Sequence, residues 1–245
     1  MKIEVLTLFP EFVEQITRYG VPRIAVEGGR LQVGTRNPRD YSGNRHRRVD
    51  DRPYGGGPGM VMQAEALAAA IAASRTQLGA AQVLSLSPQG QPLSQALLRR
   101  LAEQPAIIMV CGRYEGIDER LLTAEVDLEV SLGDFVLSGG EIAAMAVIDG
   151  IARLLPGVLG HEDSAEFDSF SAGLLDHPHY SRPEQWREAE VPEVLLSGDH
   201  ARIARWRRKR ALGATWLKRP DLLDGLELDE DSKQLLREFI AQREE

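Results

Sequence analysis

Three stretches of the chain combine glycine with residues that suit contact with a small ligand: 87–92 (SPQGQP), 112–118 (GRYEGID) and 131–141 (SLGDFVLSGGE). Glycine allows a backbone to approach a ligand closely or to adopt a positive φ. The apolar centre of the third stretch, Phe135–Leu137, suits a flat or apolar group, and Glu115 suits a positive charge. These residue types predict a pocket for a neutral or cationic small molecule. Adenosine carrying a sulfonium has that chemistry.

The elements around these stretches predict how they are positioned. Strand-like segments, such as 81–87 and the wholly apolar 106–110, alternate with helix-like segments such as 64–75 and 141–155. This alternation is typical of an α/β fold, in which a parallel sheet carries helices on both faces. Ligands in such folds bind outside the carboxyl ends of the strands. Because each stretch follows a predicted strand, we expect all three to meet at one edge of the sheet.

Other motifs give weaker indications. The chain has no dinucleotide fingerprint, no phosphate-binding loop with its lysine, and no nucleophile elbow. The glycine-rich segment 55–59 is a candidate for close contact with a substrate, although structural glycines explain it equally well. His177 and His179 lack a third nearby ligand, so we interpret them as part of a turn and expect no metal ligands from the protein. Cys111 lies in an apolar run and is predicted to be buried and unreactive.

Composition and charge narrow the class of protein. The 245 residues carry a net charge of −8 and include no apolar run of about 18 residues, so we expect a protein without a membrane span. A single cysteine agrees with a reducing compartment, the cytoplasm. The charge is uneven, because segment 202–219 holds eight Lys or Arg and no acidic residue. A locally basic surface of this kind can bind RNA on an acidic protein.

A change of composition after Pro156 predicts a second domain. We expect a main domain of residues 1–159, a flexible linker of residues 160–176 and a small all-helical domain of residues 177–245.

Two helices of this second domain matter below. One is a short helix at 183–189, and the other is a basic helix, Asp199–Leu212, that Gly213 ends.

Several strings in the sequence together resemble one family. They include HRRVDDRPYGGGPGM, LSPQGQ, VCGRYEGIDER, SLGDFVLSGGE, RLLPGVLG, GLLDHPHYSRP, LSGDHARIARWRRKRALG and TWLKRPDLL, which span nearly the whole chain. The chain resembles the bacterial tRNA (guanine-37-N1)-methyltransferases of the SPOUT superfamily. The resemblance implies a SPOUT-type fold with a C-terminal trefoil knot, which the periodicity does not indicate. It also implies a homodimer with an active site shared between subunits, S-adenosylmethionine bound in the knot, and tRNA with guanine at position 37 as substrate, and it suggests magnesium.

The family's functional residues are carried over by motif. The general base falls on Asp168, and its partner arginine falls on Arg153. The third stretch departs from the usual pattern with Phe135 in place of tyrosine, and the next helix starts with Ile142–Ala143 in place of Leu-Pro. The residues expected to contact the cofactor come from all three stretches: Leu86, Ser87, Pro88, Gly112, Tyr114, Glu115, Ser131, Leu132, Gly133, Asp134, Phe135, Val136, Leu137, Gly139 and Gly140.

The resemblance also implies a mechanism. Asp168 accepts the N1 proton of guanine, and Arg153 stabilises the negative charge that develops on O6. We expect the linker to order over a flipped guanine and the basic helix to contact tRNA phosphates. Candidates for the phosphate contacts are Arg202, Arg205, Arg207, Arg208, Lys209 and Arg210. Two other classes stay open: a related enzyme that methylates a ribose hydroxyl or another base, and a non-catalytic RNA-binding protein.

Overall fold

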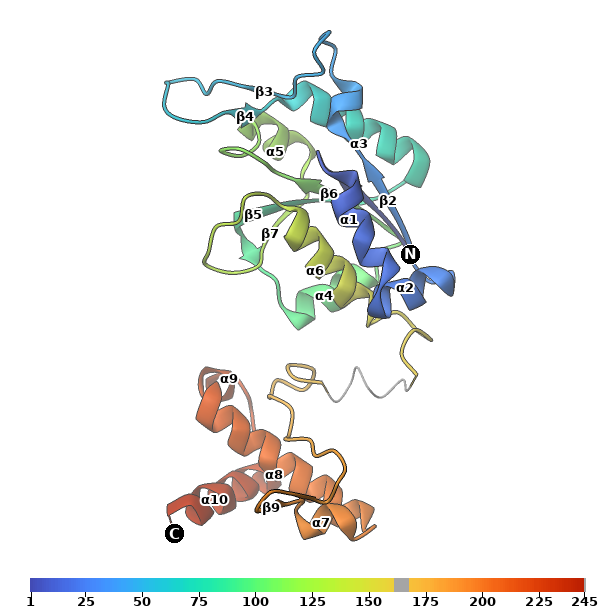
Figure 1. The fold of residues 1–245 in the computed structure, drawn as a ribbon. Helices are drawn as coiled ribbons and strands as arrows, with labels where there is room; N and C mark the ends of the chain where they lie inside the picture. Colours follow the sequence, from blue (N-terminus) through green and yellow to red (C-terminus); the bar gives the residue numbers. More distant parts are fainter. Residues whose placement is uncertain (161–167, 245) are drawn as a thin grey trace. The chain divides into compact units, whose positions relative to one another are not determined.

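The computed structural model describes residues 1–160 and 168–244 of the chain. The chain divides into two compact units, Met1–Glu162 and Asp163–Glu245 (Figure 1). Each unit has hydrophobic core residues of its own. Within the described ranges, no helix has both the length and the apolar character needed to cross a membrane.

The first unit is built on a five-stranded sheet with the strand order β2-β1-β6-β5-β7. Every neighbouring pair of its strands runs parallel, which confirms the predicted α/β class. Strand β6 lies in the middle, and all of its residues are buried. The strands are β1 (Lys2–Leu6), β2 (Gln32–Arg36), β5 (Gln82–Pro92), β6 (Ala106–Cys111) and β7 (Leu128–Ser131).

Helices cover both faces of this sheet (Figure 1). The side chains of β6 alternate between two cores, with Ile107 and Met109 in one and Ile108 and Val110 in the other. This alternation follows from the period of two along a strand, and it explains why the whole strand is apolar. One core contains α3 (Ala64–Leu78) and α5 (Glu119–Glu125), and the other contains α1 (Pro10–Glu14), α2 (Gly20–Glu27), α4 (Gln95–Ala102) and α6 (Glu141–Ala152).

Smaller elements complete the first unit. Strands β3 (Asp50–Asp51) and β4 (Val61–Met62) pair antiparallel and carry the glycine-rich segment 55–59 between them. Two 3-10 helices, η1 (Gln15–Arg18) and η2 (Pro38–Tyr41), follow α1 and β2.

Strand β5 is longer than predicted. Leu86 and Gln91 both pair with Val130 of β7, so the residues between them leave the ladder as a bulge. A Cβ atom on Gly90 would collide with the backbone of Val130. The stretch predicted as a loop after this strand is therefore an irregular continuation of the strand, and its glycine allows the close crossing of β7.

The second unit is not all-helical. It contains α7 (Glu193–Leu196), α8 (His200–Lys218), α9 (Asp221–Asp224) and α10 (Glu230–Glu244), but also a two-stranded hairpin of β8 (Gln185–Trp186) and β9 (Ala189–Glu190). The helix predicted at 183–189 is therefore wrong. The two strands are joined by a two-residue turn in which Arg187 has a φ of 59°, and positive φ is typical of such hairpin turns.

The basic helix α8 continues past Gly213 to Lys218, so the predicted end of this helix is also wrong. A Cβ atom on Gly213 would collide with the ring of Phe239. The glycine therefore allows α8 and α10 to pack closely and does not terminate the helix. The predicted N-terminus agrees with the structure, because the Asp199 carboxylate accepts hydrogen bonds from the backbone N–H groups of Ala201 and Arg202.

Residues 168–176, the described end of the expected linker, form turns that pack onto the second unit. Leu174 is buried with Leu212 and Leu235, and Leu175 N donates to Thr215 Oγ1 at 2.9 Å. This part of the segment belongs to the second unit. The linker residues 161–167 lie outside the described residues.

Candidate active site

The three glycine-bearing stretches meet in one cavity of about 480 Å³ at the carboxyl ends of β5, β6 and β7. Their convergence is what the sequence predicts for the edge of a parallel sheet. Asp134 is the one predicted cofactor residue that does not line the cavity. The lining includes Leu86, Ser87, Pro88, Gly112, Tyr114, Glu115, Ser131, Leu132, Gly133, Phe135, Val136, Leu137, Gly139 and Gly140.

Gly140 fixes the end of the third stretch against the second. Its backbone N–H donates to the carbonyl of Gly112 at 3.0 Å. A Cβ atom here would lie 2.8 Å from the Cα of Cys111 and 3.2 Å from the Cβ of Leu86. Leu86 and Cys111 are paired residues of β5 and β6, so the chain that leaves β7 returns across these two strand ends. Only glycine permits this approach without displacing the backbone.

An ion pair that the sequence analysis missed holds this arrangement. Arg113 Nη2 lies 2.9 Å from Glu141 Oε2, and Arg113 Nη1 donates to the carbonyl of Ser138 at 3.1 Å. The Glu141 side chain is only 1% exposed and also accepts a hydrogen bond of 2.8 Å from Thr7 Oγ1. The Arg113 guanidinium also lies 4.5 Å from the ring centroid of Phe9. These contacts join the second and third stretches to the first strand.

The second stretch carries a strained residue and contacts the glycine-rich segment 55–59. Tyr114 has a φ of 60°, which is rare for a side chain of this size and is often found at functional sites. Glu115 N donates to the carbonyl of Met60 at 2.9 Å, and a Cβ atom on Gly59 would collide with the Glu115 side chain. Segment 55–59 therefore lies beside the cavity stretch that contains Tyr114 and Glu115.

Glu129 of β7 is a second residue that the sequence analysis missed. Glu129 is among the residues that line the cavity, and its Oε2 atom is buried without a hydrogen-bond partner among the described residues. Burial of an unpaired carboxylate oxygen is costly, so a ligand with a hydrogen-bond donor would satisfy it. On the third stretch Phe135 and Val136 are 54% and 84% exposed, which leaves apolar surface at the cavity for a ligand or partner.

Cys111 has no catalytic environment. It is fully buried, as predicted, and burial, together with nearby Glu141, raises the pKa of its thiol well above the usual range. A neutral buried thiol is a packing residue.

The two predicted catalytic residues belong to different units. Arg153 follows the last turn of α6 in the first unit, where its backbone N–H donates to the carbonyl of Asp149 at 3.2 Å. Asp168 lies in the second unit, where its backbone carbonyl accepts a hydrogen bond from Ser171 N at 3.2 Å. The cavity thus draws all of its lining from the first unit, whereas the proposed base comes from the second.

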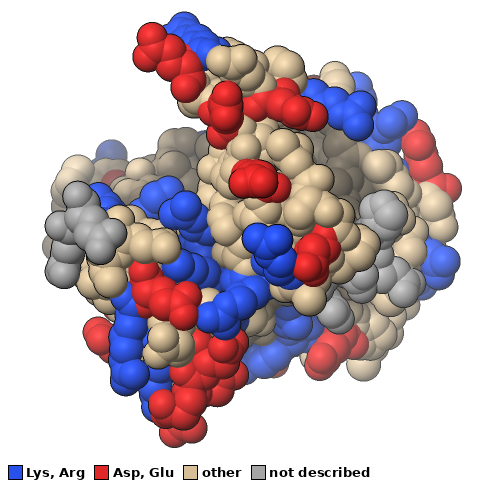
Figure 2. Space-filling model, turned by 90° about the horizontal axis from the view of Figure 1, so that it is seen from below, with Lys and Arg blue, Asp and Glu red and all other residues tan. Residues whose placement is uncertain are grey.

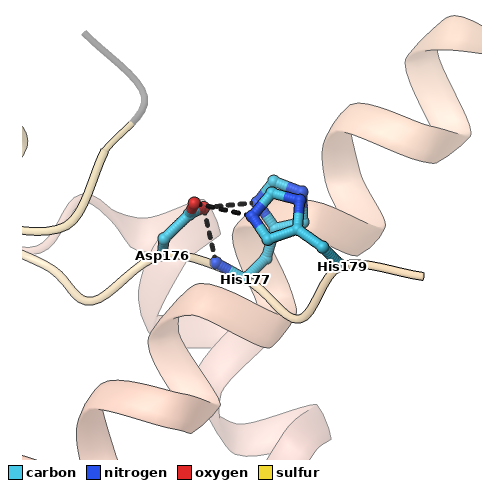
Figure 3. Close-up of side chains that lie close together, drawn as sticks. All are labelled: Asp176, His177 and His179. Atoms are coloured by element: carbon cyan, nitrogen blue, oxygen red, sulfur yellow. Dashed lines mark hydrogen bonds and ion pairs between the residues drawn. The ribbon is translucent and has the colours of Figure 1, made fainter. Parts of the chain in front are cut away.

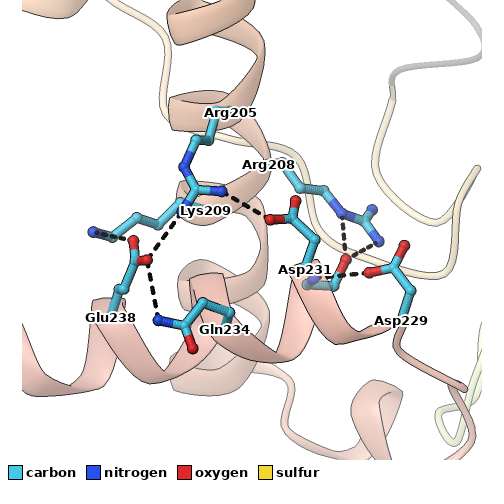
Figure 4. A network of polar contacts seen from close by, with 8 residues as sticks. Arg205, Arg208, Lys209, Asp229, Asp231, Gln234 and Glu238 are labelled. Atoms are coloured by element: carbon cyan, nitrogen blue, oxygen red, sulfur yellow. Dashed lines mark hydrogen bonds and ion pairs between the residues drawn. The ribbon is translucent and has the colours of Figure 1, made fainter.

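The basic helix α8 directs part of its positive charge toward α10 (Figure 4). Arg205 contacts Asp231 at 2.8 Å and Glu238 at 3.0 Å. Lys209 reaches the same Glu238 at 3.5 Å. These two predicted phosphate ligands therefore take part in helix packing.

Other cations of α8 differ in their surroundings. Arg208 donates to Ser232 Oγ of α10, and the Arg210 guanidinium lies over the ring of Trp206. Arg202 and Arg207 are exposed. In the view of Figure 2, Lys and Arg side chains gather in several adjoining groups, with Asp and Glu side chains beside and between them. The exposed arginines are the better candidates for contact with a phosphate backbone.

Comparison with known proteins decides the family. A family model described as tRNA (Guanine-1)-methyltransferase TrmD matches residues 1–225. The chain belongs to this tRNA (guanine-N1)-methyltransferase family. It is 60% identical to the tRNA (guanine-N(1)-)-methyltransferase of Halorhodospira halophila over 98% of this chain and 92% of that protein. It is 58% identical to that of Alcanivorax borkumensis over 98% and 93%, and 55% identical to that of Pseudomonas entomophila over 100% and 98%.

Membership of the tRNA (guanine-N1)-methyltransferase family gives the cavity a chemical context. A methyltransferase needs a methyl donor, and the match covers all three stretches that form the cavity. It also covers Asp168 and Arg153.

Proposed function

We propose that this protein transfers a methyl group from S-adenosylmethionine to N1 of the guanine at position 37 of tRNA, next to the anticodon. The single observation that carries this proposal is the convergence of three family-matched stretches on one cavity. The family supports the guanine acceptor in tRNA, and the chemistry of the cavity supports the donor. We place the reaction in the cytoplasm.

The cavity fits the proposed donor on three counts. Its volume of about 480 Å³ lies in the range usual for small-molecule sites. Leu86 and Leu137 offer apolar surface for a flat base, and Glu115 and Glu129 offer negative charge for a cation. The buried Oε2 atom of Glu129 is suited to an N–H or O–H group of the donor. When bound, S-adenosylmethionine supplies a methyl group on a sulfonium, and S-adenosylhomocysteine remains after transfer.

Asp168 takes the proton from guanine N1. This proton must leave before N1 can act as a nucleophile, and a positioned carboxylate can accept it. We propose that docking of tRNA over Asp168 excludes water from the site and positions the carboxylate beside guanine N1. Arg153 then stabilises the negative charge that moves to guanine O6 and orients the base.

The reaction requires both units, because the cavity and Asp168 belong to different units. We propose that a homodimer assembles the complete site, with the second unit of one subunit serving the cavity of its partner. Exposed apolar side chains on α1 and α6, Phe12 and Ile142, support an interface on the first unit. We also propose that the return of the chain across Leu86 and Cys111 completes a trefoil knot.

In this proposal the second unit binds tRNA, mainly through its domain of residues 177–245. Arg202 and Arg207 contact phosphates, which positions the RNA without reading its sequence. Residues 168–176, the described part of the expected linker, cover the flipped guanine in this proposal. Segment 55–59 approaches the same substrate beside Glu115, which it contacts in the first unit.

Magnesium has no defined place in this mechanism. The carboxylates that line the cavity, Glu115, Glu119 and Glu129, are of the type that binds magnesium. In the ranges that the structure describes, however, no three carboxylate, His or Cys ligands gather at the cavity. The mechanism therefore derives no step through a metal.

The test uses tRNA transcripts and S-adenosylmethionine labelled in the methyl group. We expect label in a transcript with guanine at position 37, and none when that guanine is replaced while the guanine before it is kept. Nuclease digestion should identify the product as N1-methylguanosine. Label on a ribose hydroxyl would indicate the related enzyme class. Failure of the protein to bind the donor would indicate a non-catalytic RNA-binding protein.

A further inference from the structure

Asp176, His177 and His179 form a compact cluster in the second unit (Figure 3). His177 Nδ1 lies 2.7 Å from Asp176 Oδ1, and His179 Nε2 lies 2.8 Å from Asp176 Oδ2. Each of the three residues offers one ligand atom: a carboxylate oxygen of Asp176 and one ring nitrogen of each histidine. These three atoms lie within 4.8 Å of one another. The sequence offered two histidines without a third ligand nearby, and the fold supplies that ligand from the preceding residue.

We propose that Asp176, His177 and His179 bind a divalent transition metal ion of the zinc type. Two imidazole nitrogens and one carboxylate are a usual donor set for zinc in sites that keep an open position. Nitrogen donors disfavour magnesium and calcium, which prefer oxygen ligands. The ion takes the place of the direct contacts between the two imidazole nitrogens and the carboxylate.

The surroundings hold the donors in place. Asp176 N donates to Ser169 Oγ at 2.9 Å, and His177 N donates to Asp176 Oδ1 at 2.7 Å. The His177 ring lies edge-on to Trp206 of α8, with ring centroids 6.4 Å apart. The cluster therefore packs against α8.

The fold also shifts the pKa values of two of the donors. Burial lowers the pKa of His177 below its usual value, because loss of water disfavours the charged ring. Burial alone would raise the pKa of Asp176, but hydrogen bonds from His179 and from His177 N hold it below its usual value. The positive charge of nearby Arg207 repels cations. A metal ion that forms strong bonds to nitrogen is therefore favoured over one that is held mainly by charge.

Space remains for the other ligands of the ion. His177 and His179 border an open hollow of about 1000 Å³ in the second unit, together with Tyr180 and Arg207. Water or a partner group can complete the coordination from this side. Because Asp176 is hydrogen-bonded to Ser169, the neighbour of Asp168, the ion would stiffen the turn that carries the proposed base.

The test measures Zn²⁺ binding by calorimetry on chelator-treated protein from which any histidine tag has been removed. We expect one Zn²⁺ per chain and an affinity that falls as the pH is lowered, because binding displaces protons. The His179→Ala variant should bind Zn²⁺ at least about tenfold more weakly than the wild type. Loss of a residue that only hydrogen-bonds to a metal ligand already weakens metal binding by about that factor. His179 is 70% exposed, so this variant should keep its fold. The His46→Ala control, changed in an exposed loop of the first unit, should bind as the wild type does.

The visible absorption spectrum of bound Co²⁺ provides a second measurement on the same proteins. We expect visible ligand-field absorption with the wild type and its loss in the Asp176→Asn and His179→Ala variants. Zn²⁺ binding that is absent, or equal in the wild type and His179→Ala, would overturn the proposal. Neither tRNA nor S-adenosylmethionine is present in these assays, so their outcome is independent of the proposed methyl transfer.

Discussion

The first unit gathers its candidate residues on one sheet, whereas the second unit uses much of its positive charge for its own packing. Three strand ends bring fourteen predicted residues to one cavity in the first unit. In the second unit Arg205 and Lys209 face acidic residues of α10, and only part of the basic helix stays available. A parallel sheet thus organises a binding site through its topology, while a charged helix has to divide its side chains between stability and recognition.

The largest effect should come from a substitution in the second unit that lowers turnover but leaves donor binding in the first unit unchanged. Asp168→Asn removes the proposed base in the second unit and should lower turnover by about 10²–10⁴-fold. The affinity for the methyl donor should stay within about twofold of the wild-type value, because the cavity belongs to the first unit. A twofold change is small beside the tenfold change that about 1.4 kcal/mol would produce. Single-turnover assays and calorimetry measure the two quantities. Full turnover by this variant would remove Asp168 from the mechanism.

The next effect concerns the ion pair that joins the cavity stretches. Arg113→Met leaves the Glu141 carboxylate buried without its cation and should destabilise the protein by about 3 kcal/mol. Arg120→Met is a matched control, because Arg120 pairs with Asp118 at the surface, and loss of that exposed pair should cost much less stability than loss of the buried one. Urea denaturation gives both values. Equal losses in the two variants would refute a special role for the buried pair.

A smaller change tests the glycine at the crossing of the strand ends. Gly140→Ala places a Cβ atom 2.8 Å from the Cα of Cys111, and the backbone must shift. We expect a loss of about 1–3 kcal/mol in stability, together with weaker donor binding. Gly43→Ala has open space around its Cβ and should change neither property. An unchanged donor affinity in Gly140→Ala would mean that the third stretch does not shape the cavity.

Glu129→Gln tests the buried carboxylate of the cavity. The change keeps the shape of the side chain but removes its charge, so the affinity for S-adenosylmethionine should fall by about tenfold, the scale of one hydrogen bond to a charged group. The fold should be retained, because Oε2 has no partner among the described residues. Comparison of donor analogues with and without the amino group, by calorimetry, identifies the group that it contacts. Unaltered affinity for every analogue would exclude Glu129 from donor binding.

The smallest effects should distinguish arginines of α8 that bind tRNA from arginines that stabilise the second unit. Arg202→Ala should weaken tRNA binding by a few-fold and lower its salt dependence by about one counterion. Arg205→Ala should act mainly on the thermal stability of the second unit, because this arginine joins α8 to α10. Filter binding at several salt concentrations, together with melting curves, distinguishes the two. The reverse pattern would assign Arg205 to the RNA surface.

The sequence predicts those features that depend on local pattern. The apolar run of β6 and the glycine-bearing strand ends indicated the parallel sheet and the meeting of three stretches at one of its edges, and both are present. Features that depend on distant neighbours were missed or wrong. Gly213 is typical of a helix end, but the ring of Phe239 explains it, and Arg113 lies 28 residues from Glu141 in the chain. Asp176, the third donor of the proposed metal site, is adjacent in sequence, but the turn is needed to bring its carboxylate to both rings.

A crystal structure of the protein grown with S-adenosylhomocysteine tests the central claim most directly. The proposal predicts the adenosyl group between the stretches that contain Leu86, Tyr114 and Leu137, with a donor group of the ligand hydrogen-bonded to Glu129 Oε2. A ligand bound outside this cavity, or one that makes no contact with the third stretch, would contradict it.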